Sequence, residues 1–183
     1  AALDAADVRA LGTGNLAALD SAQIAALNSA QVALLSTTQI QALSTEQWAA
    51  LDTVDVRALT TTQIVALPTA LIAAMSSAQI AALSTEQIGV LSTADIRGLT
   101  STQAAALGSD QVLAFSTGQL AALDSADVRA LATGVVALMG TDQIAALTTA
   151  QVSRLTTAQI AALGTDQIVA IETVDGAAFA SAQ

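Results

Sequence analysis

The chain has 183 residues with 15 acids against 5 bases, every base an arginine, for a net charge of −10, and it contains no histidine or cysteine. This balance excludes the basic surface that nucleic-acid binding requires, and the missing residue types exclude disulfides, thiolate or imidazole catalysis and the commonest transition-metal ligands. Hydrophobic residues make up 54% of the chain but aromatic residues only 2%, so a core must arise from many small contacts. No apolar run approaches the ~18 residues that span a bilayer, and we expect no signal peptide.

A unit of eight residues repeats from Leu3 to Phe179 without insertion or deletion. We label its positions a to h, so that in the copy Ser84–Leu91 the serine occupies a and the leucine occupies h. Position e is large and apolar, g is mostly alanine, b is serine or threonine, and d is glutamine, aspartate or asparagine. Residues 1–183 are therefore predicted to form one continuous array of about 22 octapeptides. We expect this array to be a segment of a longer one or a subunit that stacks end to end.

Each copy carries the signature of a helix start. Ser84 is suited to the N-cap, and Gln87 stands at N3, where it completes a capping box. Leu83 precedes the cap and Ile88 follows at N4, the spacing of a hydrophobic staple. The sequence predicts a helix over positions b to h, joined to the next by the single residue at a.

The charges follow the same polarity. Every acid lies at positions a, c or d, and every arginine lies at f or g. Anions at the start and cations at the end of a helix are what the helix dipole favours. The acids are Asp4, Asp20, Asp52, Asp124 and Glu172 at a, Glu46, Glu86, Asp110, Asp142 and Asp166 at c, and Asp7, Asp55, Asp95, Asp127 and Asp175 at d; the arginines are Arg9, Arg57, Arg97, Arg129 and Arg154.

Two-turn helices of this length are unstable alone, so we expect them to stack with e and h in a shared core. The predicted fold is all-α, a single-layered or superhelical α-solenoid with one short helix per repeat. The alternative is a β-solenoid, favoured by threonine at b and by isoleucine and valine at e. Alanine at f and g, glutamine at d and the segregated charges count against it.

Three Asp-x-x-Asp pairs are the candidates for a calcium site: Asp4/Asp7, Asp52/Asp55 and Asp124/Asp127. Calcium needs six or more oxygens, and no EF-hand loop accompanies these pairs. We interpret them as N-cap and N3 acids on solvated helix starts. Trp48 stands at position e, where we interpret it as a core substitution. We expect no catalytic, cofactor-binding or metal-binding residue, and no cofactor.

The hydroxyl residues at position b and the arginines at position f have a less certain purpose. The hydroxyls at b are predicted to satisfy free carbonyls at the end of an adjacent helix, with an ice-binding array as the remote alternative. Arginine at f accompanies aspartate at d in four copies, as in Asp55 and Arg57. Residues two apart do not face each other on a helix. Duplication of one ancestral unit is therefore favoured over pairing between neighbouring repeats.

The segment Leu155–Leu163, LTTAQIAAL, resembles the tandem octapeptide arrays of some very large bacterial secreted or surface-attached proteins. The resemblance covers nearly the whole chain and implies a structural or adhesive module. We expect a non-enzymatic rigid spacer, stalk or filament, located extracellularly or at the cell surface, whose partners are further copies of the same repeat. The alternative is a protein-binding scaffold that uses one solenoid face, and a remote alternative is an ice- or calcium-binding repeat.

Overall fold

The computed structural model describes residues 4–171, and the regular structure of this range consists of short α-helices without a strand. The predicted α-solenoid is confirmed, and the β-solenoid alternative is wrong. The copy that contains Glu172, Asp175 and Phe179 lies outside the described residues. No helix between residues 4 and 171 has the length and apolar character needed to cross a membrane.

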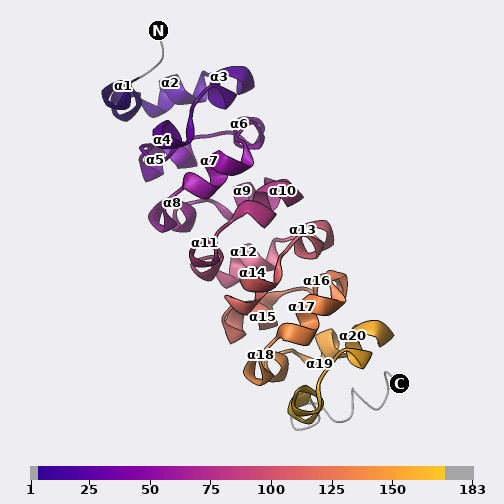
Figure 1. Cartoon of the computed structure of the whole chain (residues 1–183). Coiled ribbons are helices and arrows are strands. Elements are labelled where there is room, and N and C mark those ends of the chain that lie inside the picture. The colour runs from indigo at the N-terminus through magenta and orange to yellow at the C-terminus, as the bar shows by residue number, and fades with distance from the viewer. Residues whose placement is uncertain (1–3, 172–183) are drawn as a thin grey trace. The chain divides into compact units, whose positions relative to one another are not determined.

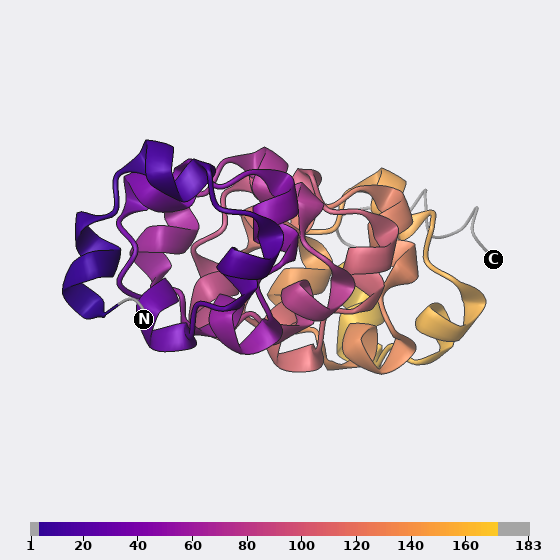
Figure 2. The ribbon, with the colours of Figure 1, turned by 90° about the horizontal axis from the view of Figure 1, so that it is seen from above.

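The chain divides into two compact units, residues 1–91 and residues 92–183. In the ribbon views of Figures 1 and 2, each unit consists of short helices joined by tight bends. The helices of the first unit are α1 (Ala5–Ala10), α2 (Thr13–Ala17), α3 (Ser21–Ala25), α4 (Ser29–Val32), α5 (Thr37–Gln41), α6 (Thr45–Ala49), α7 (Thr53–Ala58), α8 (Thr61–Val65), α9 (Thr69–Ala74), α10 (Ser77–Ala82) and α11 (Thr85–Gly89). Those of the second unit are α12 (Thr93–Arg97), α13 (Ser101–Ala105), α14 (Ser109–Leu113), α15 (Thr117–Ala122), α16 (Ser125–Ala130), α17 (Thr133–Leu138), α18 (Thr141–Ala145), α19 (Thr149–Val152) and α20 (Thr157–Ala161). Residues 165–171 are helical as well.

Every one of these helices begins at position b, with the residue at a as its N-cap. Ser84 has an extended backbone (φ −71°, ψ 165°), its side chain accepts a hydrogen bond from the Gln87 N–H, and its carbonyl accepts the first helical bond from Ile88 at 2.9 Å. Helices α1 to α20 have four to six residues and are shorter than the predicted span of b to h. Position h leaves the helix, as Leu59 does with φ −61° and ψ 139°. The bend therefore occupies both h and a, which turns the chain while the leucine side chain stays in the core.

Positions e and h supply the core, as predicted. Ile88 and Trp48 at e are fully buried, and Leu83 at h is 3% exposed. Position d is a third buried column, since Gln87 is only 2% exposed. The sequence predicted only a capping role for this column, and its burial shows that d also faces another part of the fold.

Helices three places apart in the chain pack against each other within each unit, as α4 does with α7 and α13 with α16. Hydrogen bonds from position d, described below, join repeats that are four places apart. One turn of the superhelix therefore contains between three and four repeats. Because both spacings recur through each unit, every repeat occupies nearly the same environment.

Replacing Leu59, which is 4% exposed, with alanine is expected to lower the free energy of unfolding by about 2–5 kcal/mol, because it leaves a cavity at a core position. Urea unfolding followed by circular dichroism measures this change. Val65, at 64% exposure, is the control, and its replacement by alanine should change the free energy by no more than about 0.5 kcal/mol. Equal effects of the two substitutions would contradict the assignment of h to the core.

Candidate functional site

The glutamine at position d forms hydrogen bonds with both of its amide atoms. In Gln87, Oε1 accepts a hydrogen bond from the Ser84 N–H at 2.8 Å, within the same repeat. Its Nε2 donates to the carbonyl of Leu59 at 2.7 Å and to that of Val56 at 3.1 Å, which lie 28 and 31 residues earlier. Since four repeats contain 32 residues, one side chain joins the start of α11 to the end of α7.

The same bonds recur through both units, and we call this set of side chains the glutamine seam. The seam includes Gln39, Gln47, Gln63, Gln79 and Gln87 in the first unit, and Gln143, Gln151, Gln159 and Gln167 in the second. The bond from Nε2 to the carbonyl at h measures 2.7–3.1 Å in all nine. The seam therefore satisfies carbonyls that the end of a helix leaves without an intrahelical partner.

The hydroxyl column at b was predicted to bond these carbonyls, and that prediction is wrong. Such carbonyls commonly bond within the chain when a residue after the helix takes a positive φ, but no residue between 4 and 171 has one. Glutamine has the length and the amide donor to bond them from four repeats away. Hydroxyls at b instead contact position d three repeats later where d is aspartate: Ser101 Oγ donates to Asp127 Oδ1 at 2.8 Å, and the Ser29 side chain bonds Asp55. Thr85 is exposed.

The seam is interrupted where position d is apolar. Leu71 follows Pro68 by three residues, and Val135 follows Ala132 in the same way; both apolar side chains are buried. Neither Pro68 nor Ala132 makes a side-chain cap. Instead, the Leu71 N–H donates to the Pro68 carbonyl at 2.8 Å, and the Val135 N–H donates to the Ala132 carbonyl at 2.9 Å. The helix start remains satisfied, while the bond to the earlier turn is lost.

The three acid pairs lie at the starts of α1, α7 and α16. In the first two pairs the N-cap aspartate accepts from the N–H at d at 2.8 Å, whereas Asp124 makes no such bond. Asp55 and Asp127 are 4% and 2% exposed, so the prediction of solvated helix starts is wrong for these two carboxylates. Burial raises the pKa of both, against the lowering effect of their serine partners. The same helix turn thus holds one exposed and one buried carboxylate.

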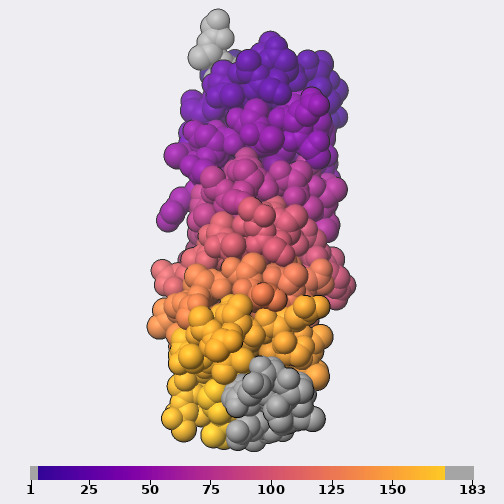
Figure 3. Space-filling model, turned by 90° about the vertical axis from the view of Figure 1, so that its right-hand side faces the viewer, coloured from indigo at the N-terminus to yellow at the C-terminus, as the bar shows by residue number. Residues whose placement is uncertain are grey.

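The described residues contain no group of three or more histidine, cysteine, aspartate or glutamate side chains that could hold a metal ion. In the space-filling view of Figure 3, neither unit shows a deep hollow on the face turned to the viewer. Trp48, at position e, is buried in the core as predicted. The expectation that the chain has no catalytic or cofactor-binding residue stays a prediction.

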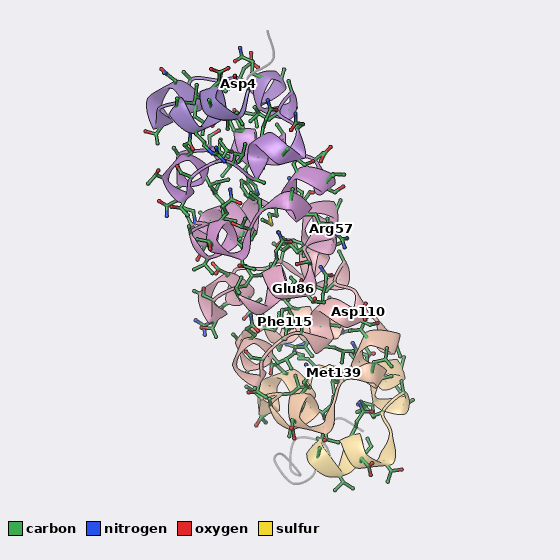
Figure 4. The ribbon with its side chains drawn as sticks, turned by 60° about the vertical axis from the view of Figure 1, so that its left-hand side comes forward. Asp4, Arg57, Glu86, Asp110, Phe115 and Met139 are labelled. Carbon is green, nitrogen blue, oxygen red and sulfur yellow. The ribbon has the colours of Figure 1, made fainter. Side chains whose placement is uncertain are left out.

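Arg57 in α7 and Glu86 in α11, both labelled in Figure 4, come from positions f and c of repeats four places apart. Hydrogen bonding by its own backbone N–H and by Ser84 lowers the pKa of Glu86, with a smaller contribution from the charge of Arg57. This is an attraction between repeats of the kind that was weighed against duplication. The residues 29 positions after Arg9, Arg97 and Arg129 are Thr38, Ala126 and Ala158. Pairing therefore does not explain the arginine column, and duplication stays the preferred hypothesis.

Replacing Gln87 with glutamate is expected to destabilise the chain by about 3–5 kcal/mol at neutral pH, because it removes the Nε2 donor and buries a charge. The free energy of urea unfolding measures the loss. Gln23 offers a matched control at the same position d, since it keeps the cap bonds to Asp20 but is exposed. Gln23→Glu should be neutral or slightly stabilising, because the charge lies at a helix start. Equal losses in the two variants would contradict the donor role.

The chain was compared with protein families and with curated proteins. A family model described as the ALTTAQ repeat matches residues 1–37, 25–53, 48–85, 61–93, 85–117 and 120–157. No curated protein matches the chain. The overlapping matches span most of the sequence and follow the eight-residue helical repeat described above. The chain therefore belongs to the ALTTAQ repeat family.

Proposed function

We propose that this chain is a non-enzymatic structural spacer, a stalk or filament whose length is set by its number of octapeptides. The family and the helical repeat architecture indicate a non-catalytic repeat protein. The observation that carries the finer proposal is the glutamine seam. It joins each turn to the next by the same bonds, so further repeats can be added in the same register.

Stiffness is the property that a spacer needs, and the seam supports it. Bending a solenoid requires adjacent turns to separate on one side. In this chain, separating two turns would break buried hydrogen bonds such as that from Gln87 Nε2 to the Leu59 carbonyl. The Leu59 carbonyl would then have no partner in a site closed to water, which is costly. Apolar contacts at e and h resist the same opening. Short helices that slide on an apolar core alone would lack this directional restraint.

The expected partners are further copies of the same repeat, either in the same chain or in a second molecule. The glutamine seam supports this part of the proposal, since it joins repeats within each unit by the same bonds. The extracellular or cell-surface location is proposed from the resemblance to arrays of secreted bacterial proteins.

The second candidate is a protein-binding scaffold, and exposed apolar side chains favour it. Six such residues lie at c, f or g: Val54, Val65, Val90, Leu113, Leu138 and Val169. Binding surfaces are usually anchored by a cluster of aromatic or arginine side chains. None of these six is of that kind, which is why we prefer the spacer.

Small-angle scattering on a series of arrays tests the spacer. Each turn adds one helix-to-helix distance of roughly 8–10 Å, so seven added octapeptides, about two turns, should lengthen the particle by roughly 16–20 Å. The length should grow linearly with repeat number. A plateau, or a particle that expands in all directions, would contradict a stiff solenoid.

The role itself is tested in the organism's own protein that carries this array. Alanine and glycine substitutions at the exposed positions c and f should leave its function unchanged, whereas deleting seven repeats should impair it and an unrelated rigid spacer of equal length should restore it. If the surface substitutions abolish function while circular dichroism shows an intact fold, the scaffold is correct. Sedimentation over a range of concentrations separates a filament from a monomeric spacer.

A further inference from the structure

Asp127 occupies a position of the seam that requires a hydrogen-bond donor. A glutamine at 127 would donate to the carbonyls 31 and 28 residues earlier, as Gln159 does to Val128 and Leu131; for position 127 these are Ile96 and Leu99. An aspartate carboxylate has only acceptor oxygens. The Asp127 carboxylate and the carbonyls of Ile96 and Leu99 are therefore all hydrogen-bond acceptors, and none of them supplies a donor to the others.

The two oxygens of Asp127 are in different situations. Oδ1 accepts a hydrogen bond from Ser101 at 2.8 Å. Oδ2 is buried and has no hydrogen-bond partner in the part of the chain that the structure describes. A buried carboxylate oxygen without a donor is costly. A proton on Oδ2 removes the charge and provides the missing donor.

We propose that Asp127 forms a proton-binding contact between two turns of the solenoid, which we call the Asp127 joint. This contact is strong when the carboxyl group is protonated and weak when the carboxylate is charged. Protonated Oδ2 donates toward the carbonyls of Ile96 and Leu99, directly or through one water, while Ser101 continues to hold Oδ1. Asp55 in the first unit is also buried at d, with Ser29 as its hydroxyl partner, but its Oδ2 accepts a hydrogen bond from the Asp52 N–H at 3.3 Å. Asp127 thus makes the seam responsive to pH.

The charged groups around Asp127 do not offset this effect. Burial is the main cause of the raised pKa of Asp127, and the charge of Asp124, its N-cap neighbour, raises it further, while hydrogen bonding by Ser101 and by the Asp124 backbone lowers it. The neighbouring helices α13 and α19 carry no titratable side chain, and α12, which ends at the facing carbonyls, carries Asp95 and Arg97. Arg129 on α16 is exposed. Around Asp55 the corresponding groups are Asp52 and Arg57 on its own repeat and the N-cap Asp20 of α3, while α4 and α10 carry none.

The sign of the pH dependence follows from the raised pKa of Asp127 and Asp55. The folded chain binds these protons more tightly than the unfolded chain does, so folding is favoured as the pH falls. The contribution is complete below the ordinary aspartate value of 3.8 and is lost as the pH rises through the folded-state pKa. The joint is therefore stronger in mild acid than at neutral pH.

The test compares urea midpoints of the full chain at pH 7 and pH 4 for the wild type, Asp127→Asn and a control. Asp127→Asn removes the charge and adds an amide donor, so it should raise the midpoint at pH 7 and make little difference at pH 4. Asp142→Asn removes the same charge from an exposed position c and isolates the effect of net charge. The proposal is overturned if Asp127→Asn and the wild type shift in parallel between the two pH values, or if the control reproduces the effect.

A direct titration of Asp127 in the wild-type chain tests the proposal without a substitution, whose other effects could mislead. Carboxyl carbon NMR of the wild-type chain should show Asp127 titrating above the ordinary aspartate value of 3.8. Hydrogen exchange of the backbone around residues 96–101 should slow as the pH falls, after correction for the intrinsic exchange rate. An Asp127 carboxyl that titrates at or below the ordinary value would refute the joint.

Discussion

The fold depends on a primary amide at position d of most repeats. Its oxygen satisfies the N–H at the start of its own helix, and its nitrogen satisfies carbonyls at the end of a helix one turn earlier, as in Gln87. Helices of four to six residues have most of their backbone groups outside the intrahelical pattern. A side chain that is donor and acceptor at once can complete both ends. Hydrophobic burial at e and h holds the turns together, and the amide fixes their register.

Much of the local structure could be predicted from the sequence, because it is encoded within eight residues. The residue at a, the polar residue at d and the apolar residues at e and h together indicate a capped helix with one buried face. The charge segregation points to the same helix direction. What the repeat could not specify is the partner of the glutamine nitrogen, which lies 28 to 31 residues away. The number of repeats per turn depends on that partner, so it could not be predicted either.

One signal in the sequence could have indicated the second role of position d. A capping box accepts glutamate as readily as glutamine at N3, and an acid there is favoured by the helix dipole. Nevertheless, position d contains no glutamate in any copy. A side chain needed only for the cap would be expected to vary between the two. The absence of glutamate favours a role for the nitrogen in the glutamine copies, and burial of d in Gln87 agrees with this. The acid that does occur at d is the shorter aspartate, in five copies, and it lacks that donor.

The exceptions at a and d show which of these hydrogen bonds a repeat can lose. Gly108, Gly140 and Gly164 have no capping side chain, yet each backbone N–H still donates to the glutamine oxygen, at 2.8–3.2 Å. Pro68 has no N–H to give, and in its repeat the glutamine is replaced by buried Leu71. The seam therefore tolerates loss of the side chain at a when the backbone donor remains. In the Pro68 repeat that donor is absent, and Leu71 at d packs in the core instead of forming hydrogen bonds. A glutamine there would leave its amide oxygen without the usual donor.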